Sequence, residues 1–127
     1  MNAQSTTNTH FDLADFTRAI EERDASTQLA MYATDARVTL TDRISQPGSP
    51  RVLRGRSEIA AWIEDVCARD MDHRVQHTVC DQGGAAFTEA CRYPDGTNVL
   101  CATVLELRDG QITSQIGVQA WDEPASA

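Results

Sequence analysis

Four strand-like stretches in the second half of the chain most constrain its fold. Each is rich in β-branched or aromatic residues, and the joints between them carry Asp and Gly, which tolerate the positive φ of hairpin turns. The joints read Asp81-Gln82-Gly83-Gly84, Pro94-Asp95-Gly96 and Asp109-Gly110. The stretches themselves are His73–Asp81, Ala85–Tyr93, Asn98–Arg108 and Gln111–Trp121. We therefore expect four long antiparallel strands joined by short turns.

Upstream of these stretches the apolar residues recur with the spacing of helices. Asp12 and Asp24 are candidate N-caps of two helices, and a third helix is expected to start at Arg56 or Ser57. The apolar faces consist of Leu13, Phe16, Thr17 and Ile20, then Leu29, Tyr32 and Ala33, and then Ile59, Trp62, Ile63, Val66 and Cys67.

Between the second and third helices the pattern changes again. Residues Arg37–Thr41 alternate as a strand, and the Pro- and Gly-containing segment Arg43–Leu53 is expected to be a loop without regular structure over a cavity mouth. The predicted fold class is α+β: a cone-shaped roll of three N-terminal helices packed on a strongly curved, antiparallel or mixed β-sheet.

Length and charge restrict the domain organisation and the partners. The 127 residues suit one domain over residues 11–122, with disordered tails at 1–10 and 123–127. The formal net charge is −8, there is no lysine, and the arginines are scattered, which argues against a nucleic-acid or membrane-surface partner. The polar start of the chain does not resemble a signal peptide, and no apolar run approaches the ~20 residues that span a bilayer.

The four cysteines bear on the compartment. Cys67, Cys80, Cys91 and Cys101 contain no C-x-x-C pair, so they are expected to be reduced thiols inside helices and strands. This pattern favours a cytoplasmic protein.

The order of these features resembles the nuclear transport factor 2-like superfamily, and more closely its SnoaL-like branch of polyketide cyclases and ketosteroid isomerases. The resemblance covers about residues 11–122. It is carried by Phe16 to Ile20 with Arg23-Asp24, by Leu29, Tyr32-Ala33, Asp35-Ala36 and Val38, by Gly55 and Ile59, and by Leu107-Arg108-Asp109-Gly110 with Ile112. The resemblance implies the same cone, commonly dimeric through the outer sheet face. It leaves the activity open, because this fold carries isomerases, dehydratases, cyclases, epoxide hydrolases and binding modules.

Two catalytic templates of that superfamily can be compared with the residues. Ketosteroid isomerases use a carboxylate base, a Tyr and a protonated acid, and the matching positions here are Leu40, Phe16 and Val104. All three are apolar, so the steroid-isomerase mechanism is not carried over. The dehydratase-like template pairs a carboxylate late in the first helix with a His at the start of the first long strand, which match Glu21 and His73.

The Glu21–His73 pair is chemically reasonable, because a carboxylate orients an imidazole and raises its basicity for acid–base work. The alternative is a solvated Glu21 at a helix end and a hydrogen-bonded His73 in a sheet. His77 lies four residues after His73, and on a strand that separation is ~13 Å, too far for both to bind one metal ion. No metal site and no cofactor are expected, because no nucleotide or flavin motif is present either.

Strand alternation supplies the remaining candidates. Glu89 shares a strand face with Phe87, Cys91 and Tyr93, and this face lines either the cavity or a dimer interface. Gln115 and Gln119 share a face of the last stretch and are suited to hold a carbonyl or hydroxyl group. The aromatic residues expected to line the cavity are Phe16, Tyr32, Trp62 and Phe87.

These residues lead to one functional hypothesis and one rival. The first is a cofactor-independent acid–base enzyme, a cyclase, isomerase or dehydratase, acting on a small apolar carbonyl or hydroxyl compound. Glu21, His73 and Glu89 would be catalytic. The rival is a non-catalytic ligand-binding or dimerisation module of the same fold. A homodimer is expected through the face formed by Val99, Cys101, Thr103, Leu105 and Leu107.

Overall fold

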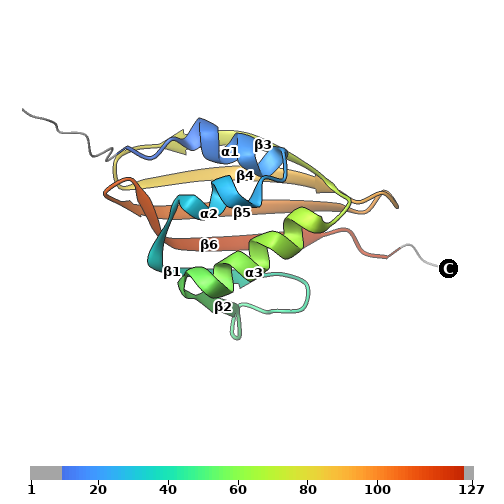
Figure 1. The fold of residues 1–127 in the computed structure, drawn as a ribbon. Helices are drawn as coiled ribbons and strands as arrows, with labels where there is room; N and C mark the ends of the chain where they lie inside the picture. The colour runs from blue at the N-terminus through green and yellow to red at the C-terminus, as the bar shows by residue number, and fades with distance from the viewer. Residues whose placement is uncertain (1–9, 125–127) are drawn as a thin grey trace, which may run out of the picture.

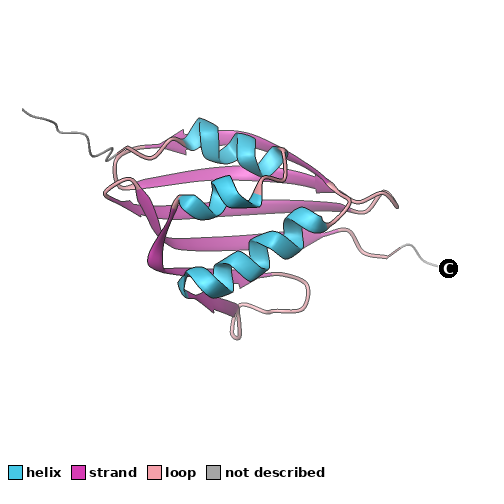
Figure 2. Cartoon of the chain, in the orientation of Figure 1, coloured by secondary structure: helices cyan, strands magenta, loops and turns pink. Residues whose placement is uncertain are grey.

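Helices lie on one face of a single curved β-sheet, as Figures 1 and 2 show. The structure is a computed structural model that describes residues 10–124. Within these residues the elements are α1 (Leu13–Glu21), α2 (Ala25–Ala30), β1 (Tyr32–Thr41), β2 (Arg51–Arg54), α3 (Gly55–Ala68), β3 (Asp72–Cys80), β4 (Gly84–Arg92), β5 (Asn98–Arg108) and β6 (Gln111–Trp121). The predicted α+β class is confirmed.

The sheet is mixed and open, with the strand order β2-β1-β6-β5-β4-β3. The four long strands pair in sequence as antiparallel neighbours, as their turn residues predict, while β1 runs parallel to β6. That parallel pair places the first strand of the chain beside the last one. The two early strands β1 and β2 therefore join the sheet beside β6, and β3 forms the opposite edge.

The first two helices begin where the sequence predicts N-caps, whereas α3 begins at Gly55, just before the expected start at Arg56 or Ser57. A side-chain oxygen of Asp12 accepts a hydrogen bond from the Asp15 N–H at 2.9 Å, and Asp24 accepts one from the Thr27 N–H at 3.1 Å. Each bond satisfies a donor that the first turn of a helix leaves without an intrahelical partner. Phe16 of α1 is 1% exposed, which fixes the face that α1 turns to the sheet.

The boundary after α2 differs from the prediction. The second helix ends at Ala30, and Tyr32 and Ala33 open strand β1 instead of completing the helix. The Ile112 N–H donates to the Met31 carbonyl at 2.9 Å, and Tyr32 pairs with Ile112 in the sheet. The apolar spacing of Tyr32 and Ala33 fits both a helix and a strand. Pairing with β6, about 80 residues further along the chain, makes them a strand.

The segment Arg43–Leu53 also differs from the prediction, because it is not wholly irregular. Its end belongs to β2, which pairs antiparallel with β1 and places Val38 opposite Leu53. Residues 42–50, which include an isolated bridge between Asp42 and Ser45, connect the two strands. The prediction was wrong at Arg51–Leu53, because an edge strand needs only a few alternating residues once a partner strand is available.

The two faces of β5 are the reverse of the predicted assignment. Val99, Thr103 and Leu105 are buried on the inner face, whereas Leu100 and Val104 are 55% and 51% exposed on the outer face. The predicted dimer face is thus the cavity and core face. Alternation alone did not distinguish them, because both faces of this strand are apolar.

The core joins α1 to both halves of the sheet through aromatic contacts. The Phe16 ring lies 6.1 Å from the Tyr32 ring and 6.4 Å from the Phe87 ring, both at edge-to-face angles. Most of the two predicted tails, 1–10 and 123–127, lies outside the described residues. No helix of the described part is long and apolar enough to cross a membrane.

Candidate active site

A cavity of about 100 Å³ lies between the helices and the inner face of the sheet. A dry apolar cavity of ~150 Å³ binds benzene, so this space suits a compound of roughly that size or slightly smaller. Its apolar wall includes Phe16, Ile20, Leu40, Trp62, Ile63, Val66 and Phe87. The polar groups enter mainly from the sheet.

All but one of the site residues expected from the sequence line this cavity. They are Phe16, Tyr32, Trp62, His73, Phe87, Glu89, Gln115 and Gln119. Glu89, for which the sequence allowed either the cavity or a dimer interface, therefore faces the cavity. The exception is Glu21.

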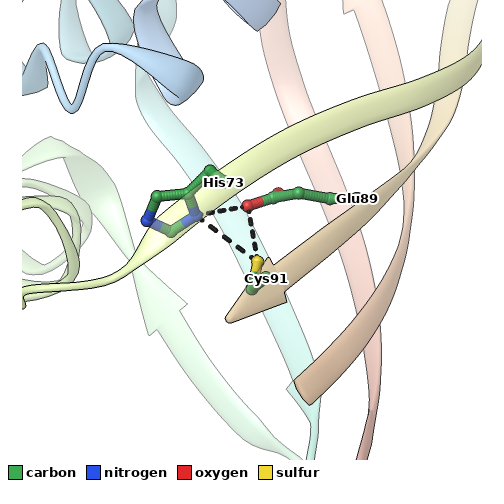
Figure 3. A group of neighbouring side chains, drawn as sticks. All are labelled: His73, Glu89 and Cys91. Carbon is green, nitrogen blue, oxygen red and sulfur yellow. Dashed lines mark hydrogen bonds and ion pairs between the residues drawn. The ribbon is translucent and has the colours of Figure 1, made fainter. Parts of the chain in front are cut away.

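His73 and Glu89 form a close buried pair (Figure 3). The distance from His73 Nδ1 to Glu89 Oε2 is 2.6 Å, and the two side chains are 4% and 13% exposed. Cys91 completes the group, with its Sγ 3.0 Å from Glu89 Oε2 and 3.4 Å from His73 Nδ1. The imidazole is thus held through Nδ1, while Nε2 makes no hydrogen bond to any described residue.

The strand register explains why these three side chains meet. His73 of β3 is directly opposite Cys91 of β4, and Glu89 lies two residues before Cys91 on the same face. Directly opposite residues have Cβ atoms roughly 4.5–5.5 Å apart, within reach of short side chains. The Glu-x-Cys alternation could be read in the sequence, but its partner on β3 depends on the register of the hairpin.

Glu21 does not join His73, which corrects the predicted pair. It is exposed at the end of α1, and its Oε2 accepts a hydrogen bond from the Val75 N–H of β3 at 2.8 Å. Its carboxylate is therefore engaged with the backbone of the strand that carries His73, two residues beyond it. The carboxylate partner of His73 is Glu89 instead.

Tyr32 and Gln115 form a second polar pair in the cavity. The Tyr32 hydroxyl donates to Gln115 Oε1, and the two residues are 1% and 6% exposed. Burial raises the pKa of the Tyr32 hydroxyl well above its ordinary value, so this group stays a donor. The Gln115 Nε2 group makes no hydrogen bond within residues 10–124 and remains available to a ligand.

A rim of larger polar and aromatic side chains borders the cavity. Trp121 stacks on Tyr93 with ring centres 5.6 Å apart, and its Nε1–H donates to Gln119 Oε1 at 3.0 Å. An Arg69 N–H donates to the Tyr93 hydroxyl at 3.0 Å, and the Arg43 guanidinium lies 4.1 Å above the Trp121 ring. Of these rim residues the sequence predicted a role only for Gln119, although it placed Tyr93 on the same strand face as Glu89.

The Cys91 thiol also lies beside the thiol of Cys101. A hydrogen bond with Cys101, burial and the nearby Glu89 carboxylate together raise the pKa of the Cys91 thiol. Cys101 lies opposite Glu89 in the β4–β5 register. No role was predicted for either cysteine, because a lone thiol on a strand usually behaves as a small apolar residue.

The three residues that match the ketosteroid-isomerase positions are all apolar, and one of them lies outside the cavity. Phe16 and Leu40 line it, whereas Val104 points outward and Thr103 occupies the inward position beside it. His77 is exposed at an irregular point of β3, where its φ is 54°. It takes no part in the group around His73.

The comparison with protein families decides the relationship. The profile of the SnoaL-like domain family matches residues 13–115. The chain belongs to this family. The resemblance expected from the sequence is therefore confirmed. Comparison with curated proteins found no match.

Solved structures of the nuclear transport factor 2-like superfamily have the same fold as this SnoaL-like domain. A Mesorhizobium loti protein of unknown function has a TM-score of 0.72 and 14% identity, covering 94% of this chain and 97% of its own. A candidate ketosteroid isomerase from Kribbella flavida has a TM-score of 0.70 and 18% identity, covering 90% and 77%.

A third similar structure is the epoxide hydrolase/cyclase-like enzyme SalBIII of pyran ring formation in the polyether salinomycin. Its TM-score is 0.66 at 19% identity, and the match covers 85% of this chain and 87% of that enzyme. At identities this low the likeness shows the shared fold alone.

Proposed function

We propose that this SnoaL-like domain is a cofactor-independent acid–base enzyme for a small, largely apolar carbonyl or hydroxyl compound. The reaction class is cyclisation, isomerisation or dehydration. The observation that carries the proposal is the buried 2.6 Å contact between His73 Nδ1 and Glu89 Oε2 at the wall of an apolar cavity. The relatives named as isomerase and cyclase-like enzymes support the same class.

The tautomer of His73 follows from this contact. The Glu89 carboxylate accepts a hydrogen bond from the Nδ1–H of His73, so the lone pair of the neutral ring lies on Nε2, which points away from Glu89 (Figure 3). Nε2 can then take a proton from a bound substrate, and the Glu89 carboxylate stabilises the imidazolium that forms. The same proton, returned at another carbon or to a leaving hydroxyl, completes an isomerisation or a dehydration.

The glutamines supply the complementary donors. Tyr32 fixes Gln115 through Oε1, and Trp121 fixes Gln119 through Oε1, so each amide keeps its N–H groups for a ligand. An amide N–H directed at a carbonyl oxygen stabilises the negative charge that develops when a neighbouring carbon loses a proton. Gln115 and Gln119 would therefore hold the substrate oxygen while His73 acts on the adjacent carbon.

The experiment measures proton abstraction without knowledge of the natural substrate. Cyclopentanone, which has six heavy atoms as benzene has, is incubated with the protein in D₂O, and exchange of its α-hydrogens is followed by NMR. Wild type is expected to accelerate exchange, and H73N and E89Q should each lose ~10²-fold or more of that rate. The matched control is E21Q, which removes an exposed carboxylate that does not contact His73.

Two results would contradict this proposal. Exchange that persists in H73N would remove His73 from the chemistry, and an equal loss in E21Q would return the role to Glu21. The rival function, a non-catalytic binding module, predicts cyclopentanone-induced shifts of the Gln115 and Gln119 side-chain amides without any exchange.

A further inference from the structure

The group formed by His73, Glu89 and Cys91 presents three different donor atoms to one point at the cavity wall (Figure 3). One imidazole nitrogen, one carboxylate oxygen and one sulfur all lie within 4.8 Å of one another. Two adjacent strands of the sheet hold them, so their relative positions do not depend on a loop.

We propose that these three side chains form a binding site for Zn²⁺ or a similar thiophilic divalent ion. Zinc takes nitrogen, oxygen and sulfur donors at roughly 2.0–2.3 Å and is commonly held by three protein ligands with a fourth position open in reactive sites. Mg²⁺ and Ca²⁺ prefer all-oxygen sites, so a set that includes a thiol disfavours them.

The geometry lies close to what a tetrahedral ion requires. Ligand atoms around such an ion are ~3.3–3.6 Å apart, given the usual zinc–ligand distances. The observed separations are 2.6 Å for His73–Glu89, 3.0 Å for Glu89–Cys91 and 3.4 Å for Cys91–His73. The Glu89 oxygen must therefore withdraw by less than ~1 Å, which its side-chain torsions allow.

Charge balance favours the ion as well. Glu89 is 13% exposed, and its side-chain partners among the described residues are His73 and Cys91, with no arginine. A doubly charged ion with neutral His73, the Glu89 carboxylate and the Cys91 thiolate has no net charge. Loading replaces the thiol proton of Cys91 and leaves His73 neutral, so it releases one proton.

The fourth position faces the cavity that these residues line. Cys101 lies opposite Glu89 on β5, but it is not part of the group within 4.8 Å, so water or a ligand atom is expected there instead. The ion would occupy Nδ1, which places the remaining proton of His73 on Nε2. A loaded protein would therefore lack the Nε2 lone pair that the proposed acid–base chemistry uses.

Cobalt spectroscopy tests the site without any substrate. Co²⁺ is added to the reduced, metal-free protein, and a sulfur-to-cobalt charge-transfer band with intense visible bands is expected at one ion per chain. Zn²⁺ should displace the cobalt and abolish both bands. C91S should lose the charge-transfer band, and E89Q should weaken binding by more than the roughly 10–100-fold that loss of an outer-shell partner causes.

C80S is the matched control, because Cys80 is an exposed thiol on β3 outside the group. It should retain the bands, and the heat of Zn²⁺ binding should vary among buffers as the release of one proton requires. Absence of a sulfur-to-cobalt band in wild type, or its survival in C91S, would overturn the proposal. Should C91S fail to fold, as judged by circular dichroism, E89Q and C80S decide the question, and unchanged affinity in E89Q overturns the site.

These outcomes are distinguishable from those of the proposed function. Failure to bind cobalt leaves the cyclopentanone exchange untouched, and failure of exchange leaves the cobalt spectrum untouched. If both hold, added Zn²⁺ should reduce exchange to the level of H73N.

Discussion

Replacement of Tyr32 by Phe removes one buried hydroxyl group, and this loss should destabilise the protein. The Tyr32 hydroxyl donates to Gln115 Oε1 where both side chains are nearly inaccessible to water. Phenylalanine keeps the ring and its contact with Phe16, so the packing of α1 on β1 is unchanged. What changes is that Gln115 Oε1 loses its donor in a buried place.

The magnitude follows from two contributions. A net hydrogen bond contributes about 0.5–1.5 kcal/mol, and a buried group left without a partner costs about 1–3 kcal/mol. We therefore expect Y32F to lower the free energy of unfolding by ~2 kcal/mol. With a urea dependence of about 1–3 kcal/mol per molar, the unfolding midpoint should fall by ~1 M.

A double-mutant cycle isolates the pair. Q115L removes the acceptor and should be destabilising for the mirror-image reason, because the Tyr32 hydroxyl then lacks a partner. The double variant Y32F/Q115L leaves no unpaired group, so its loss should be clearly smaller than the sum of the two single losses. Urea unfolding followed by circular dichroism measures all three variants.

T103V is the matched control for this cycle. Thr103 also lines the cavity and is 7% exposed, but its hydroxyl makes no hydrogen bond to the described residues. Its removal should change the free energy of unfolding by less than ~0.5 kcal/mol. Additivity of Y32F and Q115L within ~0.5 kcal/mol, or a loss in T103V equal to that in Y32F, would refute the reasoning.

Two further predictions concern assembly and pH. We propose a homodimer through the outer face of β5 and β6, where Val104 lies opposite Ile116 and both are about half exposed. Light scattering should give twice the chain mass for wild type and for I44E, in which the 87% exposed Ile44 of the β1–β2 loop is replaced, and one chain mass for V104E. A wild-type monomer at micromolar concentration would contradict this proposal. Hydrogen bonds from the Thr27 side chain and backbone lower the pKa of Asp24 below its ordinary value of 3.8. The stabilisation by ionised Asp24 is therefore present above pH 3.8 and disappears as the pH falls through the lowered pKa. Acid should narrow the difference in urea midpoint between wild type and D24N. A difference that stays constant with pH would contradict the role of Asp24.

Local sequence signals predicted the elements that are defined by local chemistry. Asp12 and Asp24 cap helices because a short carboxylate reaches the N–H two or three residues later, which needs no distant partner. The turn at Asp109-Gly110 likewise needs only residues that accept positive φ, and both have it, at 53° and 77°.

The sequence was a poor guide where a distant strand decides the outcome. Tyr32 follows Leu29 at a helical spacing, yet its pairing with Ile112 makes it the first residue of β1. The same holds for the two faces of β5, which are both apolar. Which face becomes the inner one depends on the register with β4, where Thr103 pairs with Phe87 on the cavity side.

The candidate site is the sharpest case of this limit. Alternation correctly grouped Glu89 with Cys91 and Phe87 on one face, but it carried no information about which β3 residue lies opposite. Comparison with the dehydratase-like template led to Glu21, a residue near in space that instead binds the β3 backbone. Because His73 lies opposite Cys91, its carboxylate partner is Glu89 instead of Glu21, and the Cys91 thiol lies beside the pair.

The thiol changes the chemistry available to the pair. A buried carboxylate needs a positive charge or a hydrogen-bond donor nearby, and among residues 10–124 the partners of the Glu89 carboxylate are His73 and Cys91, with no arginine. Glu89 and His73 together are suited to hold and move a proton. With Cys91 beside them, the Glu89 carboxylate becomes one of three metal ligands. The E89Q variant therefore removes the common element of both proposals, while C91S, which keeps the His73–Glu89 contact, should abolish metal binding and spare most proton exchange. Equal loss of exchange in C91S and E89Q would mean that the sulfur also positions the catalytic pair.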